Sequence, residues 1–360
     1  MNTLDTFTKI LRENARQQTL RKSYLIKLQQ KQYPFAGINS NSAPIERIFQ
    51  SPGPIYDPQG RGADYWRTGR AFYAAGFRQG DLVQNCLSYH LTPGGFILDA
   101  GAKACGCTVI PAGPGQTEQQ LEVIAHLKPQ GYCGTPSFLN ILRQKGDISS
   151  IKKALVTGEA LPESLRLSFE DGGISVLQAY ANADAGLIAY ESKAKMGMIV
   201  AEDIIVEIVR PGTNKPVTQG EVGEIVITCF NEAYPLIRFA TGDLSAVLEG
   251  KSPCGRTNMM IKGWLGRADQ TTKVKGMFVH PEQIVCHYPA LNKARLVVSS
   301  KNHNDEMLLI CESSEPESVD ETDLRDRIKA LTKLNGRVKL VGLNCIANDG
   351  KVIEDLRVYN

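Results

Sequence analysis

Short apolar segments that end in small residues alternate with helical segments between about residues 62 and 185. The apolar segments that show this pattern are 80–89, 107–113, 131–137 and 152–160. Alternation of strands and helices is typical of a parallel α/β sheet, whose ligands lie beyond the carboxyl ends of the strands. We therefore expect a parallel sheet covered by helices, with a binding site at that edge.

The pattern changes after about residue 190, where apolar segments are separated by turn signals such as PGTNKP. This pattern predicts antiparallel β structure, as a small barrel or a distorted sheet. Beyond about residue 270 the pattern is that of a small split βαβ unit. Its expected elements are helices over 281–294 and 321–334 and strands over 295–300, 306–313 and 337–346.

The first 61 residues carry two further patterns. Apolar residues at helical spacing over 4–31, with basic residues on the other face, predict one or two amphipathic helices packed on the main domain. A membrane surface or an acidic partner is the alternative for a basic helix. Residues 33–61 are rich in Pro, Gly, Ser and Asn and predict a loop.

Composition excludes several functional classes. The 360-residue chain has 41 Lys and Arg against 38 Asp and Glu, a net charge of +3 that does not predict a nucleic-acid binder. No apolar stretch reaches the ~20 residues that span a bilayer, and residues 1–18 lack the apolar core of a secretory signal. The nine scattered cysteines favour free thiols in a reducing cytoplasm.

Several catalytic motifs are missing from the sequence. It contains neither a Walker-type phosphate loop, nor a G-x-G-x-x-G turn after a strand, nor a G-x-S-x-G nucleophile elbow. The pairs Cys105/Cys107 and Cys286/His287 lack metal-ligand spacing, so cysteine-based metal binding is not expected.

Four ordered segments resemble one family. They are VTGEALPESLR (156–166), QAYANADAG (178–186), GEVGEIVITCFNEAYPLIRFATGDL (220–244) and CGRTNMMIKGWLGRADQTTKVKGMFVHPEQI (254–284). Together they resemble the adenylate-forming acyl-CoA ligases, most closely the AMP-forming phenylacetate-CoA ligases. The resemblance runs from about Ile45 to the C-terminus, and the preceding residues are shorter than, and unlike, the usual N-terminus of that family.

The resemblance implies a fold and a domain division. A large α/β adenylation domain of mixed sheets, flanked by helices and carrying a small β subdomain, would precede a small α+β domain. The expected ranges are a helical segment at 1–44, the α/β part at 45–189, the β-rich part at 190–268 and a mobile domain at 270–360.

The reaction implied by the resemblance has two half-steps. ATP and a carboxylate give an acyl-adenylate and pyrophosphate, and the thiol of CoA then displaces AMP. The expected substrate is a small, aromatic or related carboxylic acid. The first step needs the phosphate charge to be neutralised, usually by Mg²⁺ and lysine. Many relatives are dimers, so the chain as a homodimer is left open.

The resemblance assigns five residues to the nucleotide. Gly158 and Glu159 match the backbone that lines the adenine, and Tyr180 matches the aromatic residue that packs on the adenine ring. Asp243 matches the carboxylate that accepts both ribose hydroxyls. Arg267 matches an arginine that contacts ribose or phosphate.

Three further residues have implied roles. Asp269 matches the hinge about which the small domain rotates between half-reactions. Lys351 matches the adenylation lysine, which bridges carboxylate and phosphate oxygens. Asp184 replaces the glutamate that binds Mg²⁺ and remains a hard oxygen ligand.

The acyl pocket of the family is lined by two segments that match residues 88–95 and 111–115 here. The residues that would accommodate a flat acid are Tyr89, His90, Gly94, Pro111 and Gly113. For Tyr89, a packing role is the alternative.

The sequence departs from the family at two motifs. The phosphate loop reads IFQSPGPIYDPQG (48–60), without the family's threonines and lysine, and two prolines remove backbone donors. Ala183 replaces a hydroxyl residue that contacts phosphate. These losses leave two alternatives: an impaired relative that binds nucleotide or acyl-adenylate, and an adenylating enzyme with an acceptor other than CoA.

Overall fold

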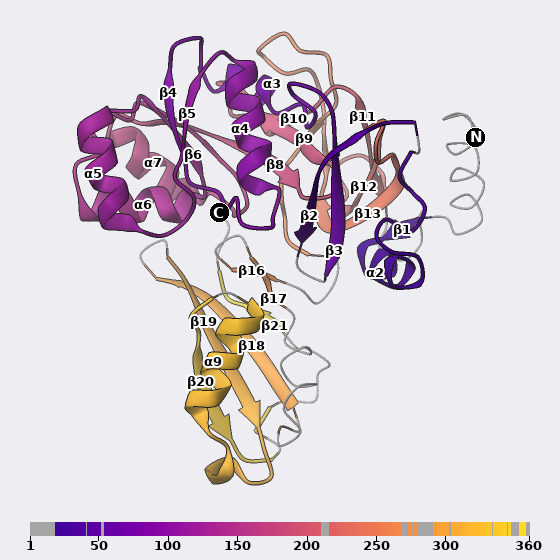
Figure 1. Cartoon of the computed structure of the whole chain (residues 1–360), viewed down its shortest axis with the longest axis vertical. Helices are drawn as coiled ribbons and strands as arrows, with labels where there is room; N and C mark the ends of the chain where they lie inside the picture. The colour runs from indigo at the N-terminus through magenta and orange to yellow at the C-terminus, as the bar shows by residue number, and fades with distance from the viewer. Residues whose placement is uncertain are drawn as a thin grey trace. The chain divides into compact units, whose positions relative to one another are not determined.

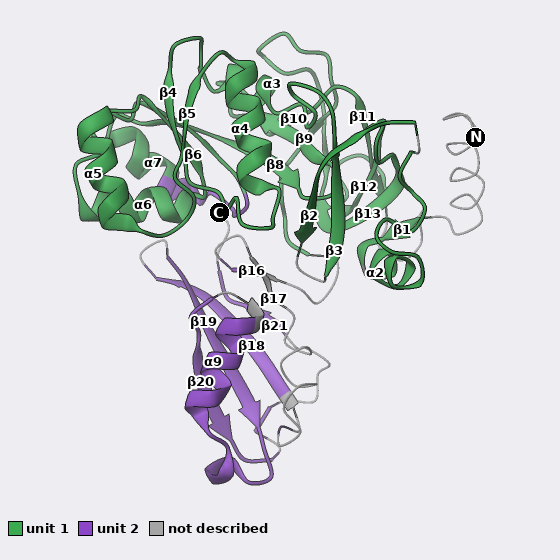
Figure 2. Cartoon of the chain, in the orientation of Figure 1, with its two compact units in different colours: residues 1–157, 166–268 green, residues 158–165, 269–360 purple. Residues whose placement is uncertain are grey.

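The computed structural model of the chain describes residues 19–40, 42–51, 54–209, 216–267, 272–274, 277–279, 291, 293–301, 304–332, 334–343, 345–346 and 353–357. Contacts divide the chain into two compact units (Figure 2). Unit 1 comprises residues 1–157 and 166–268, and unit 2 comprises residues 158–165 and 269–360.

A nine-stranded sheet forms the centre of unit 1, in the order β14-β15-β10-β9-β8-β7-β6-β4-β5. Its parallel part consists of β4 (Leu82–Asn85), β5 (Thr108–Pro111), β6 (Gly131–Gly134), β7 (Lys153–Val156) and β8 (Ser175–Asn182). Its antiparallel part consists of β9 (Gly186–Glu191), β10 (Met198–Val200), β14 (Val247–Leu248) and β15 (Met260–Ile261). The expected parallel α/β sheet is confirmed.

Helices make the crossovers that parallel strands require. These helices are α4 (Gly94–Ala104), α5 (Thr117–Leu127), α6 (Pro136–Lys145) and α7 (Glu163–Asp171), and a further helix, α3 (Gly69–Ala74), precedes β4. Helix α4 packs on α3 and on strands β4 and β5, while α6 contacts α5 and β6 (Figure 1). The strands of this sheet, with α3 and α4, contribute many of the residues of the main hydrophobic core.

A second, four-stranded sheet in unit 1 has the order β1-β13-β12-β11. Its strands are β1 (Leu20–Arg21), β11 (Ile204–Val209), β12 (Gly223–Cys229) and β13 (Leu236–Ser245). The last three pair antiparallel, which confirms the antiparallel β structure expected after residue 190, whereas β1 pairs parallel with β13. Helix α2 (Lys22–Lys31) follows β1 directly and packs on β13 (Figure 1). Helix α2 confirms the prediction of helix for the last part of residues 4–31, and residues 1–18 lie outside the described part.

The loop prediction for residues 33–61 was wrong for its second half, where a hairpin forms. Strands β2 (Ile45–Ser51) and β3 (Ile55–Gly60) pair antiparallel as a separate two-stranded sheet. Pro58 pairs with Ile48, and a two-stranded ribbon tolerates proline because each strand has an unpaired edge. The loop prediction failed because it relied on the proline and glycine content of this segment.

Unit 2 contains a four-stranded sheet in the order β20-β19-β18-β21 and one long helix. The elements are β18 (Lys293–Lys301), β19 (Asn304–Glu312), β20 (Arg337–Val341), β21 (Ile353–Asp355), α9 (Glu321–Thr332), the 3₁₀ turn Pro316–Ser318, and the small pair β16 (Thr272–Val274) and β17 (Met277–Val279). This confirms the α+β class of the small domain. The helix expected over 281–294 falls largely outside the described residues, but Lys293 and Ala294 belong to β18 and not to a helix.

Candidate functional site

The carboxyl ends of the parallel strands lie in register at one edge of the large sheet. Asn85 pairs with Cys133, Gly134 with Val156, and Val156 with Gln178. Most of the predicted ligand-contacting residues of the α/β part follow these strand ends. They are Tyr89 after β4, Pro111 and Gly113 at the end of β5, Gly158 and Glu159 after β7, and Tyr180 and Asp184 at the end of β8.

Three protein donors converge on the buried carboxylate of Asp243. The Tyr180 hydroxyl donates to Oδ2 at 2.7 Å. The Trp264 indole N–H and an Arg267 N–H both donate to Oδ1 at 2.9 Å. The Arg267 and Asp243 side chains are 8% and 4% exposed, so this ion pair is shielded from solvent. Protein donors therefore engage both carboxylate oxygens of Asp243.

Backbone pairing explains how these residues meet. Asp243 lies in β13 and forms an isolated antiparallel bridge with Arg267. The Leu244 N–H donates to Gly266 O and the Leu265 N–H donates to Leu244 O, both at 2.9 Å. The segment that carries Trp264 and Arg267 is therefore held against β13 by main-chain bonds, which do not depend on a ligand.

The hydroxyl of Tyr180 contacts Asp243 and Thr241, and the sequence did not predict these contacts. Its side chain is buried, and its hydroxyl lies 3.4 Å from Thr241 Oγ1 as well as close to Asp243. Burial and the neighbouring Asp243 charge raise the pKa of Tyr180 well above its ordinary value, so the phenol keeps its proton as a donor. Trp264 was missed from the sequence, because nothing in the local pattern distinguishes it from a packing residue.

Asp184, the predicted Mg²⁺ ligand, contacts a lysine from the N-terminal segment. Lys22 Nζ lies 2.7 Å from Asp184 Oδ2. Burial lowers the pKa of Lys22, but the carboxylates of Asp184 and Asp57 outweigh it and raise that pKa above its ordinary value of 10.5. Lys22 is therefore an ammonium at neutral pH.

Asp57, on β3, is the second buried carboxylate of this group. It accepts a short hydrogen bond from Ser51. Burial and the charge of Asp184 raise its pKa to about 7, although Lys22 opposes the shift. Among the described residues, Oδ1 of Asp57 and Oδ1 of Asp184 are buried and have no hydrogen-bond partner. Neither Lys22 nor Asp57 was predicted from the sequence.

The loop that carries Asp184 is fixed by its own turn. Asn182 Oδ1 accepts the Ala185 N–H at 2.8 Å, and the buried Arg67 guanidinium donates to Ala185 O at 2.5 Å. Gly186 has φ +79°, and a Cβ there would lie 2.5 Å from the Trp66 ring, so this turn requires glycine.

Two more of the predicted nucleotide residues follow strand β7, and two further predicted residues lie outside the described part of the chain. Gly158 has φ +83° and, like Glu159, is half-buried in the segment that follows β7. The hinge residue Asp269 and the adenylation lysine Lys351 lie outside the described residues.

The predicted acyl-pocket residues Tyr89 and Gly113 are both tied to Asn85 at the end of β4. The Asn85 side-chain amide donates to the Tyr89 hydroxyl at 2.7 Å, and the Gly113 N–H donates to Asn85 O at 3.0 Å. The Tyr89 ring packs edge-to-face on Phe96 at 5.1 Å. Burial raises the pKa of Tyr89, so its hydroxyl is neutral.

The other three predicted pocket residues make fewer contacts. His90 and Pro111 are exposed, and Gly94 begins helix α4. Asn85, which holds the two segments together, was missed because a lone asparagine after an apolar run usually marks a turn.

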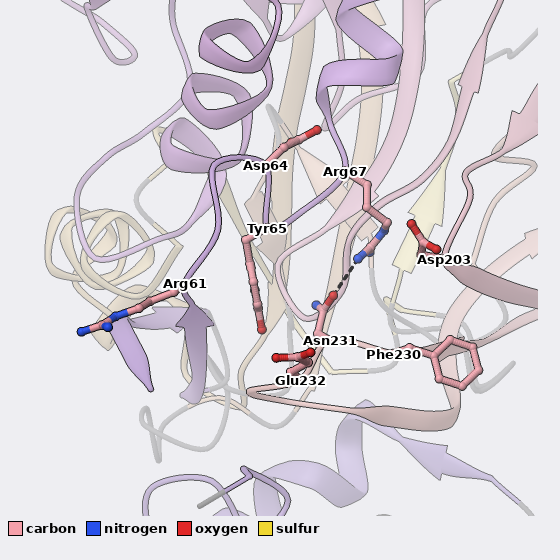
Figure 3. A pocket seen from close by; sticks show the side chains of 8 residues that line it. All are labelled: Arg61, Asp64, Tyr65, Arg67, Asp203, Phe230, Asn231 and Glu232. Carbon is pink, nitrogen blue, oxygen red and sulfur yellow. Dashed lines mark hydrogen bonds between the residues drawn. The ribbon is translucent and has the colours of Figure 1, made fainter. Parts of the chain in front are cut away.

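A polar cavity of about 260 Å³ lies in another part of unit 1 (Figure 3). It is lined by Arg61, Asp64, Tyr65, Arg67, Asp203, Phe230, Asn231 and Glu232. Figure 3 shows the Arg67 guanidinium turned toward Asn231, whose Oδ1 it contacts at 2.6 Å. Asp64 accepts the N–H groups of Thr68 and Gly69 at the start of α3. These polar groups hold local structure, so we assign the cavity no ligand.

Metal-ligand clusters and membrane-spanning helices are both absent from the described residues. No group of three or more His, Cys, Asp and Glu side chains there is arranged to hold a metal ion. Within the same residues, no helix is long and apolar enough to cross a membrane.

Comparisons with known proteins agree with this architecture. The family model for AMP-binding enzymes matches residues 69–229. The phenylacetate-coenzyme A ligase of Thermus thermophilus is 32% identical over 264 residues, and the match covers 69% of this chain and 59% of that protein. The phenylacetate-coenzyme A ligase of Escherichia coli K12 is 29% identical, with 90% of this chain and 82% of that protein covered. The chain thus spans less than two thirds of its Thermus relative.

A solved structure shows the same fold. The crystal structure of 2-hydroxyisobutyryl-CoA ligase in complex with 2-HIB-AMP and CoA superposes with a TM-score of 0.84 at 24% identity, covering 94% of this chain and 80% of that chain. The resemblance expected from the sequence is therefore confirmed. Residues 69–229 of the chain match the family of AMP-binding enzymes, and the chain is phenylacetate-CoA ligase-like in sequence.

Proposed function

We propose that the chain is an AMP-forming acid–thiol ligase that activates a small carboxylic acid. In the first half-reaction a carboxylate oxygen attacks the α-phosphorus of ATP, which forms the acyl-adenylate and releases pyrophosphate. In the second, the CoA thiol attacks the acyl carbon, which forms a thioester and releases AMP. The observation that carries the proposal is the Tyr180–Asp243–Arg267 cluster in a chain of this family.

The adenosine is proposed to bind beside the carboxylate of Asp243. An acceptor-only carboxylate suits ribose hydroxyls, and a flat aromatic ring suits adenine. Because Asp243 already accepts bonds from Tyr180, Trp264 and Arg267, a ribose must share or displace one of them. Gly158 and Glu159 are proposed to border the adenine, as the matched family segment implies.

Positive charge for the phosphates is proposed to come from three places. Arg267 lies beside the proposed ribose site. Lys351 is proposed to bridge the reacting carboxylate and phosphate oxygens, and a cation next to Asp184 is the third source. We also propose that residues 270–360 form a mobile domain that turns about Asp269, since one site must serve two half-reactions.

The acid is proposed to be aromatic and to lie along the Tyr89 segment. Support comes from the pairing of Tyr89 with Phe96 and from the Asn85 bonds that join this segment to Gly113. His90, Gly94 and Pro111 are proposed to complete the pocket. Tyr89→Ala should then raise the KM for an aromatic acid more than the KM for ATP.

A pyrophosphate-release assay tests the proposed activity. The wild-type chain is mixed with ATP, Mg²⁺ and a panel of aryl and alkyl carboxylic acids, with and without CoA, and compared with Lys351→Ala. Acid-dependent release that is lost in Lys351→Ala supports adenylation, and thioester formed with CoA identifies the acceptor. Release without any thioester assigns the adenylate to an acceptor other than CoA.

Two observations favour a second function, in which the chain binds nucleotide or acyl-adenylate without forming it. Both oxygens of Asp243 are engaged by protein donors, and the sequence 48–60 lacks the lysine of the family's phosphate loop. AMP binding in calorimetry, together with no pyrophosphate release for any acid, would establish this function instead.

A cytoplasmic location and a homodimer remain proposals. Every cysteine in the described part of the chain is a free thiol, as expected in a reducing compartment. Sedimentation velocity would measure the oligomeric state.

A further inference from the structure

Residues 20–31, which precede the part of the chain that resembles the family, are anchored to strand β13 and to the β2–β3 hairpin. Strand β1 pairs with β13, with Leu20 opposite Phe239 and Arg21 opposite Ala240. Arg21 also forms an ion pair at 2.7 Å with Glu224, whose side chain is fully buried. The start of helix α2 is therefore fixed against the sheet that carries Asp243.

Helix α2 is also bound to the hairpin that stands in place of the phosphate loop. The buried Gln29 side chain donates to Tyr56 O at 2.9 Å and accepts the Tyr56 N–H at 2.8 Å. Leu25, on the same helix, is fully buried. These contacts fix the backbone position of Lys22, the first residue of the helix.

The local helix rules disfavour Lys22 at this position. Helix N-termini favour acidic side chains, because their free N–H groups carry partial positive charge. Helix α2 begins with lysine and has no acidic residue in its first turn. A residue placed against its local preference points to compensation elsewhere in the fold. Here that compensation is the buried Asp184, 2.7 Å from Nζ.

The surroundings of Lys22 have the charge of a cation site. Asp57 and Asp184 come from different elements, are 3% and 4% exposed, and each retain an oxygen without a partner among the described residues. Two carboxylates with hard oxygen atoms would suit a divalent cation if the ammonium were absent.

Magnesium does not fit while Lys22 is present. Mg²⁺ requires near-octahedral oxygen ligands at about 2.0–2.1 Å, and Asp184 Oδ2 is already bonded to the ammonium. We propose that Lys22 is a resident cation that takes the place of the divalent metal beside Asp184. It supplies, from the N-terminal segment, positive charge that the 48–60 segment no longer carries.

Two consequences follow. Divalent cations should be excluded from the Asp57–Asp184 pair, and removal of the ammonium should admit them. A second consequence rests on the proposed function: AMP binding should not need a divalent cation at Asp184, because Lys22 already neutralises that carboxylate.

Mn²⁺ binding, followed by electron paramagnetic resonance of free Mn²⁺, tests the exclusion on the full chain. The variants are Lys22→Met, Lys22→Arg, Asp184→Asn, Lys22→Met with Asp184→Asn, and Lys27→Met as the control, since Lys27 is an exposed lysine on the same helix. We expect Lys22→Met to bind Mn²⁺ at least about 100-fold more tightly than wild type, because a full charge leaves the site. Lys22→Arg and Lys27→Met should bind Mn²⁺ like the wild type. Adding Asp184→Asn to Lys22→Met should abolish the gain in Mn²⁺ affinity.

Two results would overturn the proposal. One is Mn²⁺ binding by the wild type that Asp184→Asn abolishes, a result that stays informative even where Lys22→Met does not fold. The other is a folded Lys22→Met, by circular dichroism, that gains no Mn²⁺ binding.

AMP titration with EDTA or with Mg²⁺ separates this inference from the proposed function. Equal AMP affinity in both buffers supports the resident cation, and AMP binding only with Mg²⁺ overturns it. If AMP does not bind in either buffer, the proposed function fails, while the Mn²⁺ result still decides the role of Lys22.

Discussion

Replacing Asp243 by asparagine should destabilise unit 1 by about 3–5 kcal/mol, the range for breaking a buried ion pair. Solvent screening offers little discount, because the Arg267 and Asp243 side chains are 8% and 4% exposed. The substitution keeps the side-chain volume, so no cavity cost is added. What is lost is the charge that balances Arg267 and draws three donors together.

Urea unfolding followed by tryptophan fluorescence measures this loss. Both tryptophans, Trp66 and Trp264, belong to unit 1, so the signal reports that unit. Tyr180→Phe is the matched control, since it removes one hydrogen bond to the same carboxylate and should cost about 1.5–3 kcal/mol. A loss below about 1 kcal/mol for Asp243→Asn would refute the argument that this carboxylate holds the site together.

Three further outcomes are expected. The pKa of Asp57 in the folded chain is raised from 3.8 to about 7. The free energy of unfolding should therefore fall as pH rises between these values, by on the order of 4 kcal/mol. Urea midpoints of Asp57→Asn should lack this fall, and an unchanged fall would contradict the raised pKa of Asp57. Glu191→Gln breaks the buried bidentate pair with Arg166 and should cost about 3–5 kcal/mol in urea unfolding; a neutral effect would show that the pair is dispensable. Burial opposes ionisation of the exposed Cys254, but hydrogen bonds from Ser252 and Arg256 lower its pKa to about 7. Mass spectrometry should therefore find Cys254 alkylated by iodoacetamide before the exposed Cys345 at neutral pH. The reverse order of alkylation would contradict this prediction.

The sequence could predict the elements whose patterns are local. Short apolar runs that end in small residues marked the parallel strands, and turn signals between apolar segments after residue 190 marked the antiparallel strands β11, β12 and β13. These predictions succeed because strand burial and turn chemistry are encoded within about ten residues.

The contacts that give the site its character could not be predicted in the same way. Lys22 meets Asp184 across 162 positions of sequence, and Trp264 meets Asp243 only because the segment after β15 pairs with β13. Each depends on tertiary pairing and leaves no periodic signal. The misplaced lysine at the start of α2 was the one local hint, and it has meaning only once its carboxylate partner is known.

Isotope exchange between pyrophosphate and ATP tests adenylation most directly. The exchange reports reversal of the first half-reaction and needs no CoA. We predict exchange that requires a carboxylic acid and is lost in Lys351→Ala. Absence of acid-dependent exchange with every acid tested, in a folded chain that binds AMP, would contradict the account and leave a nucleotide-binding protein that does not adenylate.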